Sequence, residues 1–481
     1  MLERSLKAIL AGTNLTNKFY FFYLPYYTTT ILINNKSLPL FMEQSDNNDP
    51  ITILKELIAI NSINPFKAVL KDSKRYGIGN EQQIAEYLEK KLVQNGFKVQ
   101  KQIFQKEITV KTDYDKIVKV PLRYNIIAEK GEGEKSLLFF AHMDTVEIKE
   151  GWDTEPLEAV TKVVDCKEKI YGLGAYDMKA GIAAILSATE NVWSHKFKIK
   201  IVFVADEEYW SFGTEALLKT DFLNDVKLIV VPEISDTDKM FDKNNPNIHY
   251  PNIILGRRGR AEYEFKVRGK SAHGAHANLN KSAVNAVHEA IKLQHMVLKY
   301  CSDSELYFTY QDIKVKNSSY INYHHGGKGV ISIPEYSRFL LDRSFIVGEN
   351  AEGELQKLTQ IAIKAQKEEI IDPRAKIEIN LRERPTPYCQ PYFIDPDKHP
   401  EIREFSNLVK QFYGGYNYSV GYSVADENRL ATKNIPIISF GPEGNNCHSP
   451  NEWVNVNSLL KLADFFKMLI KEWDTKFSLH L

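Results

Sequence analysis

The chain has few features of a secreted or disulfide-stabilised protein. It contains only 4 cysteines in 481 residues, and no two of them form a Cys-x-x-Cys pair. This spacing argues against a disulfide framework and against a zinc site made of thiolates. Cys166, Cys301, Cys389 and Cys447 therefore fit a reducing, cytoplasmic compartment.

Net charge and dense basic tracts are also missing. The 62 lysines and arginines balance the 62 aspartates and glutamates, so nothing indicates nucleic acid or an anionic membrane surface as the main partner. The sequence also lacks an apolar run long enough for a membrane span. We therefore expect a small molecule as the partner.

Residues 1–41 differ in composition from the rest of the chain. They are rich in Phe, Tyr, Thr and Asn, and Glu3 is their only acidic residue. Asn14, Asn17 and Lys18 interrupt the segment, which has neither the apolar core nor the cleavage site of a signal peptide. It is either a disordered leader or lies upstream of a start at Met42, and we favour the second interpretation.

Three mainly apolar runs predict an α/β fold with buried parallel strands, because a strand covered on both faces shows no regular polar alternation. The runs are Leu137–Phe140, Ile199–Ala205 and Leu228–Val231. They lead into His142, into Glu207-Glu208 and into Glu233. In open α/β sheets, ligands bind at the carboxyl ends of the strands. We therefore expect these side chains to meet at one edge of a sheet.

A change of composition at Gly256–Gly259 predicts a second, inserted domain. Residues 261–267 alternate between apolar and charged side chains, which is typical of a half-exposed antiparallel strand. The segments that follow predict helix, strand, strand, helix and strand at Ser282–Tyr300, Leu306–Val315, Ser337–Ile346, Ala351–Glu369 and Lys376–Leu381. This order is that of a ferredoxin-like α+β domain. The proline-rich segment Arg384–Pro396 then predicts a linker back to the first domain.

Five side chains at strand ends or in adjoining loops could bind metal ions: His142, Asp177, Glu208, Glu233 and His448. Imidazole and carboxylate without thiolate suit zinc, with cobalt or manganese as alternatives. A pair of ions that share one carboxylate would use all five residues. The plain alternative is that adjacent acids flank a surface turn, but the convergence of separate segments favours a metal site.

Two further acids have expected roles beside these ligands. Glu207 precedes the expected ligand Glu208 but is not itself one of the five expected ligands. It is therefore available as the base that deprotonates a metal-activated water. Asp144 follows His142 by two residues and is a candidate acceptor for the ring N–H of His142 that does not face a metal.

These motifs resemble those of the M20 metallopeptidases, a family of deacetylases, desuccinylases, aminoacylases and carboxypeptidases. The matching segments are His142–Val146, Gly174–Gly181, Asp206–Glu208 with Gly213-Thr214, and Gly269–His273. The resemblance implies a zinc-peptidase catalytic domain with a mostly parallel central sheet and an inserted ferredoxin-like lid and dimerisation domain. The expected boundaries are 42–256 and 384–481 for the catalytic domain, including the linker, and 257–383 for the lid.

Carried over residue by residue, the resemblance implies a two-zinc centre. Asp177 would bridge the two ions through a carboxylate that a following cis peptide bond aims between them. His142 and Glu233 would complete one site, and Glu208 and His448 would complete the other.

The resemblance also implies roles for four other residues. Glu207 would be the general acid and base, and Asp144 would orient His142. His273 would reach the active site of a neighbouring subunit in a homodimer and donate a hydrogen bond to the oxyanion. Arg343 would hold the α-carboxylate of the substrate, although a salt bridge to Asp342 or another lid acid is the alternative.

Several other residues fit plain structural roles. We expect His324-His325 to lie in a solvated turn of the lid, because Gly326-Gly327 follows it. We expect Cys447 to be a small side chain packed in the protein interior. Arg257 and Arg258 could line a hinge between the domains or be solvated.

The sequence therefore predicts metal-dependent hydrolysis of the amide bond of an N-acyl amino acid or small peptide. Water activated by two zinc ions would attack, with Glu207 as the base. A dipeptidase or carboxypeptidase is the alternative to a deacylase. A catalytically inactive relative that only binds amino-acid-like ligands is disfavoured, because Glu207 and every expected ligand are present.

Overall fold

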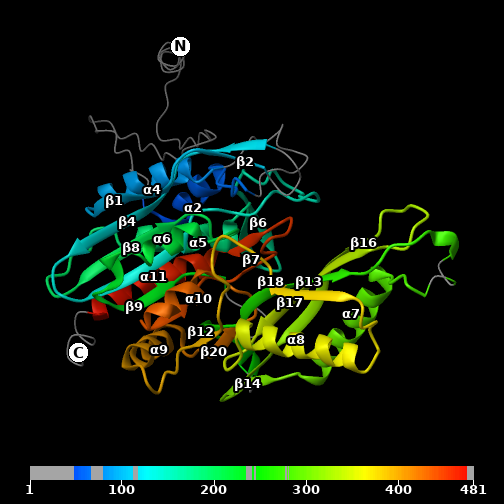
Figure 1. Cartoon of the computed structure of the whole chain (residues 1–481). Coiled ribbons are helices and arrows are strands. Elements are labelled where there is room, and N and C mark those ends of the chain that lie inside the picture. The colour runs from blue at the N-terminus through cyan, green and yellow to red at the C-terminus, as the bar shows by residue number, and fades with distance from the viewer. Residues whose placement is uncertain are drawn as a thin grey trace, which may run out of the picture. The chain divides into compact units, whose positions relative to one another are not determined.

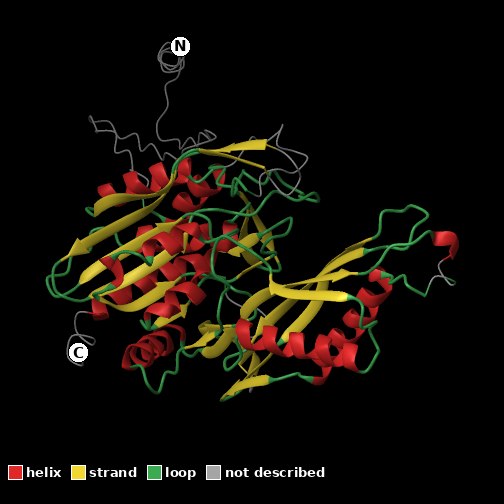
Figure 2. Cartoon of the chain, in the orientation of Figure 1, coloured by secondary structure: helices red, strands yellow, loops and turns green. Residues whose placement is uncertain are grey.

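The computed structural model describes residues 48–66, 80–111, 117–234, 241–242, 245–276, 279 and 281–473. The expected leader, residues 1–41, lies outside them. Figures 1 and 2 show a mixed arrangement of helices and strands. Within the described ranges, no helix has the length and apolarity needed to cross a membrane.

A nine-stranded sheet forms the first part of the fold. Its strands are, in spatial order, β1 (Lys98–Gln105), β4 (Arg123–Gly131), β8 (Lys198–Val204), β5 (Ser136–His142), β9 (Val226–Val231), β21 (Ile437–Ser439), β12 (Asn252–Arg257) and β19 (Tyr392–Phe393), and β20 (Asn417–Gly421) also pairs with β12. The four central strands, β8, β5, β9 and β21, run parallel, and β1 and β4 extend them with antiparallel pairing. The predicted α/β class is confirmed.

Helices accompany this sheet, and most of them present apolar side chains to its core. They are α2 (Pro50–Ala59), α4 (Gln82–Gln94), α5 (Ala180–Ala188), α6 (Phe212–Leu217), α9 (Pro400–Tyr413), α10 (Asp426–Leu430) and α11 (Val456–Glu472). Helix α5 is buried along its whole length between α2, α11 and β5, as expected of a helix that is apolar all round. Asn455 caps α11, because its side chain accepts from the backbone N–H of Ser458.

A second, antiparallel sheet has the ferredoxin-like order β16 (Ser318–Gly326), β17 (Tyr336–Phe345), β13 (Gly259–Arg268) and β18 (Lys376–Leu381). Helices α7 (Ala286–Asp303) and α8 (Ala351–Lys367) pack on it (Figure 1). Tyr263, Phe265 and Phe339 belong to an apolar core separate from that of the first sheet. The domain boundaries at 257 and 383 stay a prediction.

One predicted strand of this second sheet is wrong. Residues 306–315 do not join it, because β14 (Tyr307–Tyr310) and β15 (Ile313–Lys316) form a separate hairpin. Phe308 and Tyr310 of β14 instead pack on Phe393, each with a ring separation of 4.8 Å. The missing sheet strand is β16, whose largely exposed side chains give no buried alternation.

A small antiparallel sheet, which the sequence did not predict, brings distant segments together. Its order is β22 (Gly444–Asn445), β23 (Trp453–Asn455), β7 (Lys167–Tyr171) and β6 (Val160–Val164). Trp453 of β23 pairs with Tyr171 of β7. The loop between β22 and β23 therefore lies beside the turn η1 (Ala175–Lys179) that follows β7.

The remaining elements are short. They are the hairpins β2 (Ile108–Lys111) with β3 (Ile117–Val120) and β10 (Phe241–Asp242) with β11 (Asn245–His249), and the turns η2 (Asp221–Leu223), η4 (Gly274–His276) and η5 (Ala431–Lys433).

Candidate metal centre

The carboxyl ends of the parallel strands deliver the predicted ligands to one place. His142 is the last residue of β5, Glu208 follows β8, and Glu233 follows β9. Asp177 comes from η1, and His448 comes from the loop between β22 and β23. The structure thus brings together all five residues that the sequence singled out.

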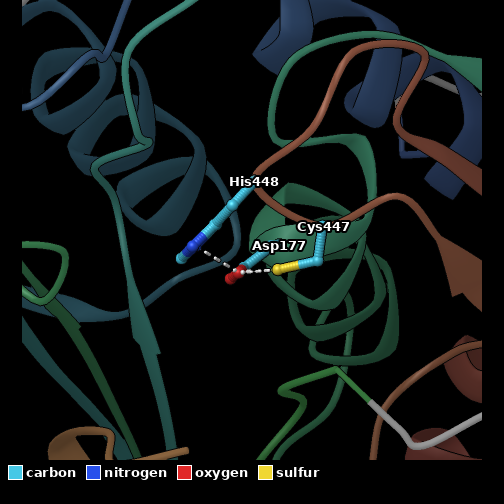
Figure 3. A group of neighbouring side chains, drawn as sticks. All are labelled: Asp177, Cys447 and His448. Atoms are coloured by element: carbon cyan, nitrogen blue, oxygen red, sulfur yellow. Dashed lines mark hydrogen bonds and ion pairs between the residues drawn. The ribbon is translucent and has the colours of Figure 1, made fainter. Parts of the chain in front are cut away.

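Asp177 lies at the middle of this group. Its Oδ1 is 3.0 Å from Nε2 of His142, and its Oδ2 is 3.1 Å from Nε2 of His448. Glu233 Oε1 lies 3.3 Å from the same nitrogen of His142, and Glu208 Oε1 lies 2.9 Å from that of His448. One carboxylate therefore joins two histidine–glutamate pairs (Figure 3 shows Asp177 with His448).

The charges of this group suit a cation. Burial alone would raise the pKa of Asp177, but hydrogen bonds with His142 and His448 hold it well below its usual value. Burial opposes protonation of His448, yet its bonds to Asp177 and Glu208 raise its pKa to about 11. Metal binding requires deprotonated ligands, so a divalent ion would take the place of the protons between these atoms. The nitrogen and oxygen donor set fits zinc, cobalt or manganese.

The segment that carries Asp177 is held by a residue that sequence reasoning missed. Glu452 is 2% exposed, and its carboxylate accepts backbone N–H bonds from Gly174 at 2.8 Å, Tyr176 at 2.9 Å and Asp177 at 2.8 Å. Burial raises the pKa of Glu452 to about 8. The peptide bond between Asp177 and Met178 is cis, as expected. The sequence around Glu452 does not predict its contact with the Asp177 segment. The contact depends on the pairing of β23 with β7, which brings two distant parts of the chain together.

Asp144 accepts the ring N–H of His142 through its backbone oxygen rather than through its carboxylate. The Nδ1 of His142 donates to the backbone oxygen of Asp144 at 2.9 Å, whereas the carboxylate Oδ1 lies 3.8 Å away. That carboxylate instead accepts the backbone N–H groups of Glu207 and Glu208, each at 3.1 Å. Asp144 therefore orients His142 through its main chain and fixes the Glu207-Glu208 turn through its side chain.

A buried polar chain supports this turn from behind. Asn64 donates to Asp144 at 2.8 Å and to Asp206 at 3.0 Å. Arg123 binds Asp206 at 2.8 Å and also pairs with Glu81. Sequence reasoning missed Asn64, Arg123 and Glu81, because they lie on separate elements far apart in the sequence.

Glu207 lies in this turn next to the ligand Glu208. Burial raises the pKa of Glu207 well above its usual value, and the neighbouring acids Glu208, Asp426 and Glu233 add to the rise against the opposing influence of His142. A carboxyl group with a raised pKa can both take and return a proton near neutral pH.

Arg343 does not reach this centre as a free cation. It is 1% exposed, and it forms ion pairs with Glu349 and Glu354, both at 2.9 Å. This geometry favours the salt bridge to lid acids that was the alternative interpretation. His273 is exposed in the loop after β13, where its Nδ1 accepts from the backbone N–H of Ala275 at 3.2 Å. Its role across a subunit interface stays a prediction.

The structure also corrects the structural roles expected for Cys447 and for His324-His325. Cys447 is not merely packed, since its Sγ lies 2.8 Å from Oδ2 of Asp177 (Figure 3). His324 and His325 lie in strand β16 rather than in a turn, and His324 bonds to Ser337 at 2.9 Å.

Arg257 ends β12 and is buried, and Arg258 follows it and is half-buried. Arg257 is 2% exposed, pairs with Glu427 at 2.8 Å and lies 3.9 Å from Glu233. Arg258 donates to the backbone oxygen of Tyr422 at 2.7 Å. Both therefore lie at the junction between β12 and β13, and a hinge between domains at this point stays a prediction.

An α/β sheet that presents a carboxylate-bridged pair of histidine–glutamate groups at its carboxyl edge defines the class of metal-dependent hydrolases. The sequence profile of peptidase family M20/M25/M40 matches residues 138–472. The chain belongs to this family, whose members are metallohydrolases that act on C–N amide bonds.

Individual relatives agree with this assignment. A succinyl-diaminopimelate desuccinylase of Nautilia profundicola is 25% identical over 354 residues, which cover 72% of this chain and 86% of that protein. A tripeptidase from Staphylococcus aureus has a similar fold, with a TM-score of 0.61 and 18% identity over 88% of this chain and 98% of that one. A dinuclear metal-binding M20 peptidase of Bacillus subtilis has a TM-score of 0.56 and 13% identity over 88% and 98% of the two chains.

Proposed function

We propose that this protein hydrolyses the amide bond of an N-acyl amino acid or a small peptide. The observation that carries the proposal is the Asp177 carboxylate, which joins two histidine–glutamate pairs beside the half-buried acid Glu207. Such a carboxylate could be shared by two metal ions of the kind that act together in hydrolases.

Two divalent ions, zinc by the chemistry of the donors, would be held by these residues. His142, Asp177 and Glu233 would hold one ion, and Glu208, Asp177 and His448 would hold the other. When bound, such ions supply Lewis-acid polarisation of the carbonyl and lower the pKa of water.

The chain's own acids would move the proton. The carboxylate of Glu207 would take a proton from the attacking water and return it to the leaving nitrogen. Its raised pKa supports both steps. Asp144 would keep this carboxylate in place through the backbone of Glu207, and Glu452 would do the same for Asp177.

The substrate class has two candidates within this reaction. The desuccinylase relative supports a deacylase, and the tripeptidase fold neighbour supports a peptidase. Purified protein assayed against N-acetyl, N-succinyl and N-formyl amino acids and against dipeptides would separate them. Hydrolysis must stop when a chelator removes the metal and return when zinc is added. A protein that hydrolyses no member of this panel would instead be an inactive relative that binds amino-acid-like ligands.

We also propose the domain arrangement expected from the sequence. Residues 257–383 would form a lid inserted between the two parts of the catalytic domain, and two copies would associate through it as a cytoplasmic homodimer. The separate apolar core of the second sheet supports the division.

A further inference from the structure

Cys447 lies in the loop between β22 and β23, one residue before the expected ligand His448. Its Sγ is 2.8 Å from Oδ2 of Asp177, and the same oxygen is 3.1 Å from Nε2 of His448. Figure 3 shows the thiol and the imidazole directed to this one carboxylate. The three donor atoms all lie within 4.8 Å of one another. A single ion could therefore contact all three after small movements of the side chains.

The surroundings of this thiol differ from those of a packed cysteine. Cys447 is partly exposed, whereas Cys301 and Cys389 are buried. Asp177 and Glu452 both act electrostatically on its sulfur. Because negative charge surrounds the thiol, a thiolate at this position requires a cation beside it. A divalent ion supplies that positive charge and displaces the thiol proton, which passes to solvent.

We propose that Cys447 is a metal ligand, which joins Asp177 and His448 as a thiolate on the ion that these two residues would hold. The inference rests on the proposed two-ion centre and goes beyond it, because the expected donor set contained only nitrogen and oxygen. Thiolate is a soft ligand that favours zinc over manganese or magnesium. The two ions of the centre would therefore differ, since His142 and Glu233 provide no sulfur on the other side of Asp177.

The alternative is that Cys447 only donates a hydrogen bond to Asp177 and so orients that carboxylate. A serine hydroxyl can replace a thiol as such a donor. It cannot replace a thiolate as a soft ligand for zinc. The variant Cys447→Ser therefore separates ligation from orientation.

The test adds Co²⁺ to the metal-free full-length protein and follows the near-ultraviolet charge-transfer absorption of a cobalt–thiolate bond. The control is Cys166→Ser, which removes an exposed thiol in the turn between β6 and β7. We expect this absorption in the wild type and in Cys166→Ser, and its loss in Cys447→Ser. Absorption of full strength in Cys447→Ser would overturn the proposal. So would its absence from wild-type protein that binds two cobalt ions.

Competition with a chromogenic chelator compares the affinities for Zn²⁺ and Mn²⁺. Cys447→Ser should weaken the binding of one zinc ion by roughly tenfold or more, and it should leave manganese binding nearly unchanged. Equal losses for the two metals would mean that Cys447 only orients Asp177, which refutes ligation.

Alkylation of the wild-type protein needs no variant and therefore does not depend on the folding of one. Iodoacetamide labelling, mapped by mass spectrometry, is compared with and without Zn²⁺. Zinc should protect Cys447 and leave the labelling of Cys166 unchanged. Equal labelling of Cys447 in both conditions, in protein that has bound zinc, would contradict ligation.

These measurements use no substrate, so they separate this inference from the proposed function. A thiolate absorption in protein that hydrolyses nothing supports the role of Cys447 and not the proposed activity. Hydrolysis by protein that binds two ions without this absorption refutes only the role of Cys447. Protein that binds no divalent ion refutes both.

Discussion

At the level of single residues, Glu207 and Glu208 are neighbours in the sequence with different surroundings. Glu208 lies 2.9 Å from Nε2 of His448, whereas burial raises the pKa of Glu207. We expect Glu207→Gln to retain bound metal, because no proposed ligand is lost. Its turnover should fall by roughly one hundred to ten thousand fold, because the base is lost. Metal analysis and initial rates on the same preparation check this.

The matched control is Glu208→Gln, which keeps the base and weakens a proposed ligand. It should lose metal content as well as activity. If the two variants exchange these behaviours, the roles assigned to the adjacent acids are reversed.

Arg123 provides a prediction about stability at the same scale. It is 2% exposed and pairs with the buried acids Asp206 and Glu81. Arg123→Met should lower the free energy of unfolding by about 3–5 kcal/mol, because two acids stay buried without a counter-charge. Urea unfolding measures the change. Lys101→Met, which breaks an exposed pair with Glu89, should cost about 1 kcal/mol or less, and a similar loss in both variants would contradict the argument.

At the level of elements, Glu452 links strand β23 to the turn η1. Its carboxylate accepts three backbone N–H groups around Asp177, so Glu452→Ala should leave these donors unpaired and let Asp177 move. We expect metal affinity to fall roughly ten- to one-hundredfold, as is usual when support behind a ligand is removed. Competition with a chromogenic chelator measures this affinity without any substrate.

Glu443 supplies the control for Glu452. It precedes β22 of the same small sheet and pairs with Lys167 in an exposed bond of 2.7 Å. Glu443→Ala should keep the metal affinity of the wild type. A matching loss in both variants would show only that the small sheet had been disturbed.

The sequence predicted those strands whose own pattern of apolar residues indicates that they are buried. The apolar runs of β5, β8 and β9 identified buried strands, and the ends of these strands indicated that His142, Glu208 and Glu233 would meet at one edge. Strand β16 was missed because its exposed side chains carry no pattern. The contacts of Glu452 and of the Asp144 side chain were missed. In both, a carboxylate accepts backbone N–H groups of a segment distant in the sequence, and local sequence patterns do not predict such contacts.

At the level of the whole molecule, the expected role of His273 can be tested in mixed dimers. We expect His273→Ala and Glu207→Gln proteins to be nearly inactive separately, since an oxyanion donor is typically worth about 3 kcal/mol. If His273 acts on the neighbouring subunit, each heterodimer has one site with both defects and one site with neither. Activity should therefore return after subunit exchange.

Exchange itself must be shown independently, for example by mass spectrometry of differently tagged chains. Heterodimers that form without any recovery of activity would place His273 within its own chain or outside the reaction.

The small sheet of β22, β23, β7 and β6 also sets the time at which the centre can form during synthesis. Cys447, next to His448, contacts Asp177 across 270 positions of the chain. At ribosomal rates of about 5–20 residues per second, roughly 15–50 s pass between the synthesis of these two segments. For most of that interval the segments with Asp177, Glu208 and Glu233 exist without the segment that carries His448. With the proposed ligand set, the centre would therefore be complete only after the segment with His448 has emerged and β23 has paired with β7.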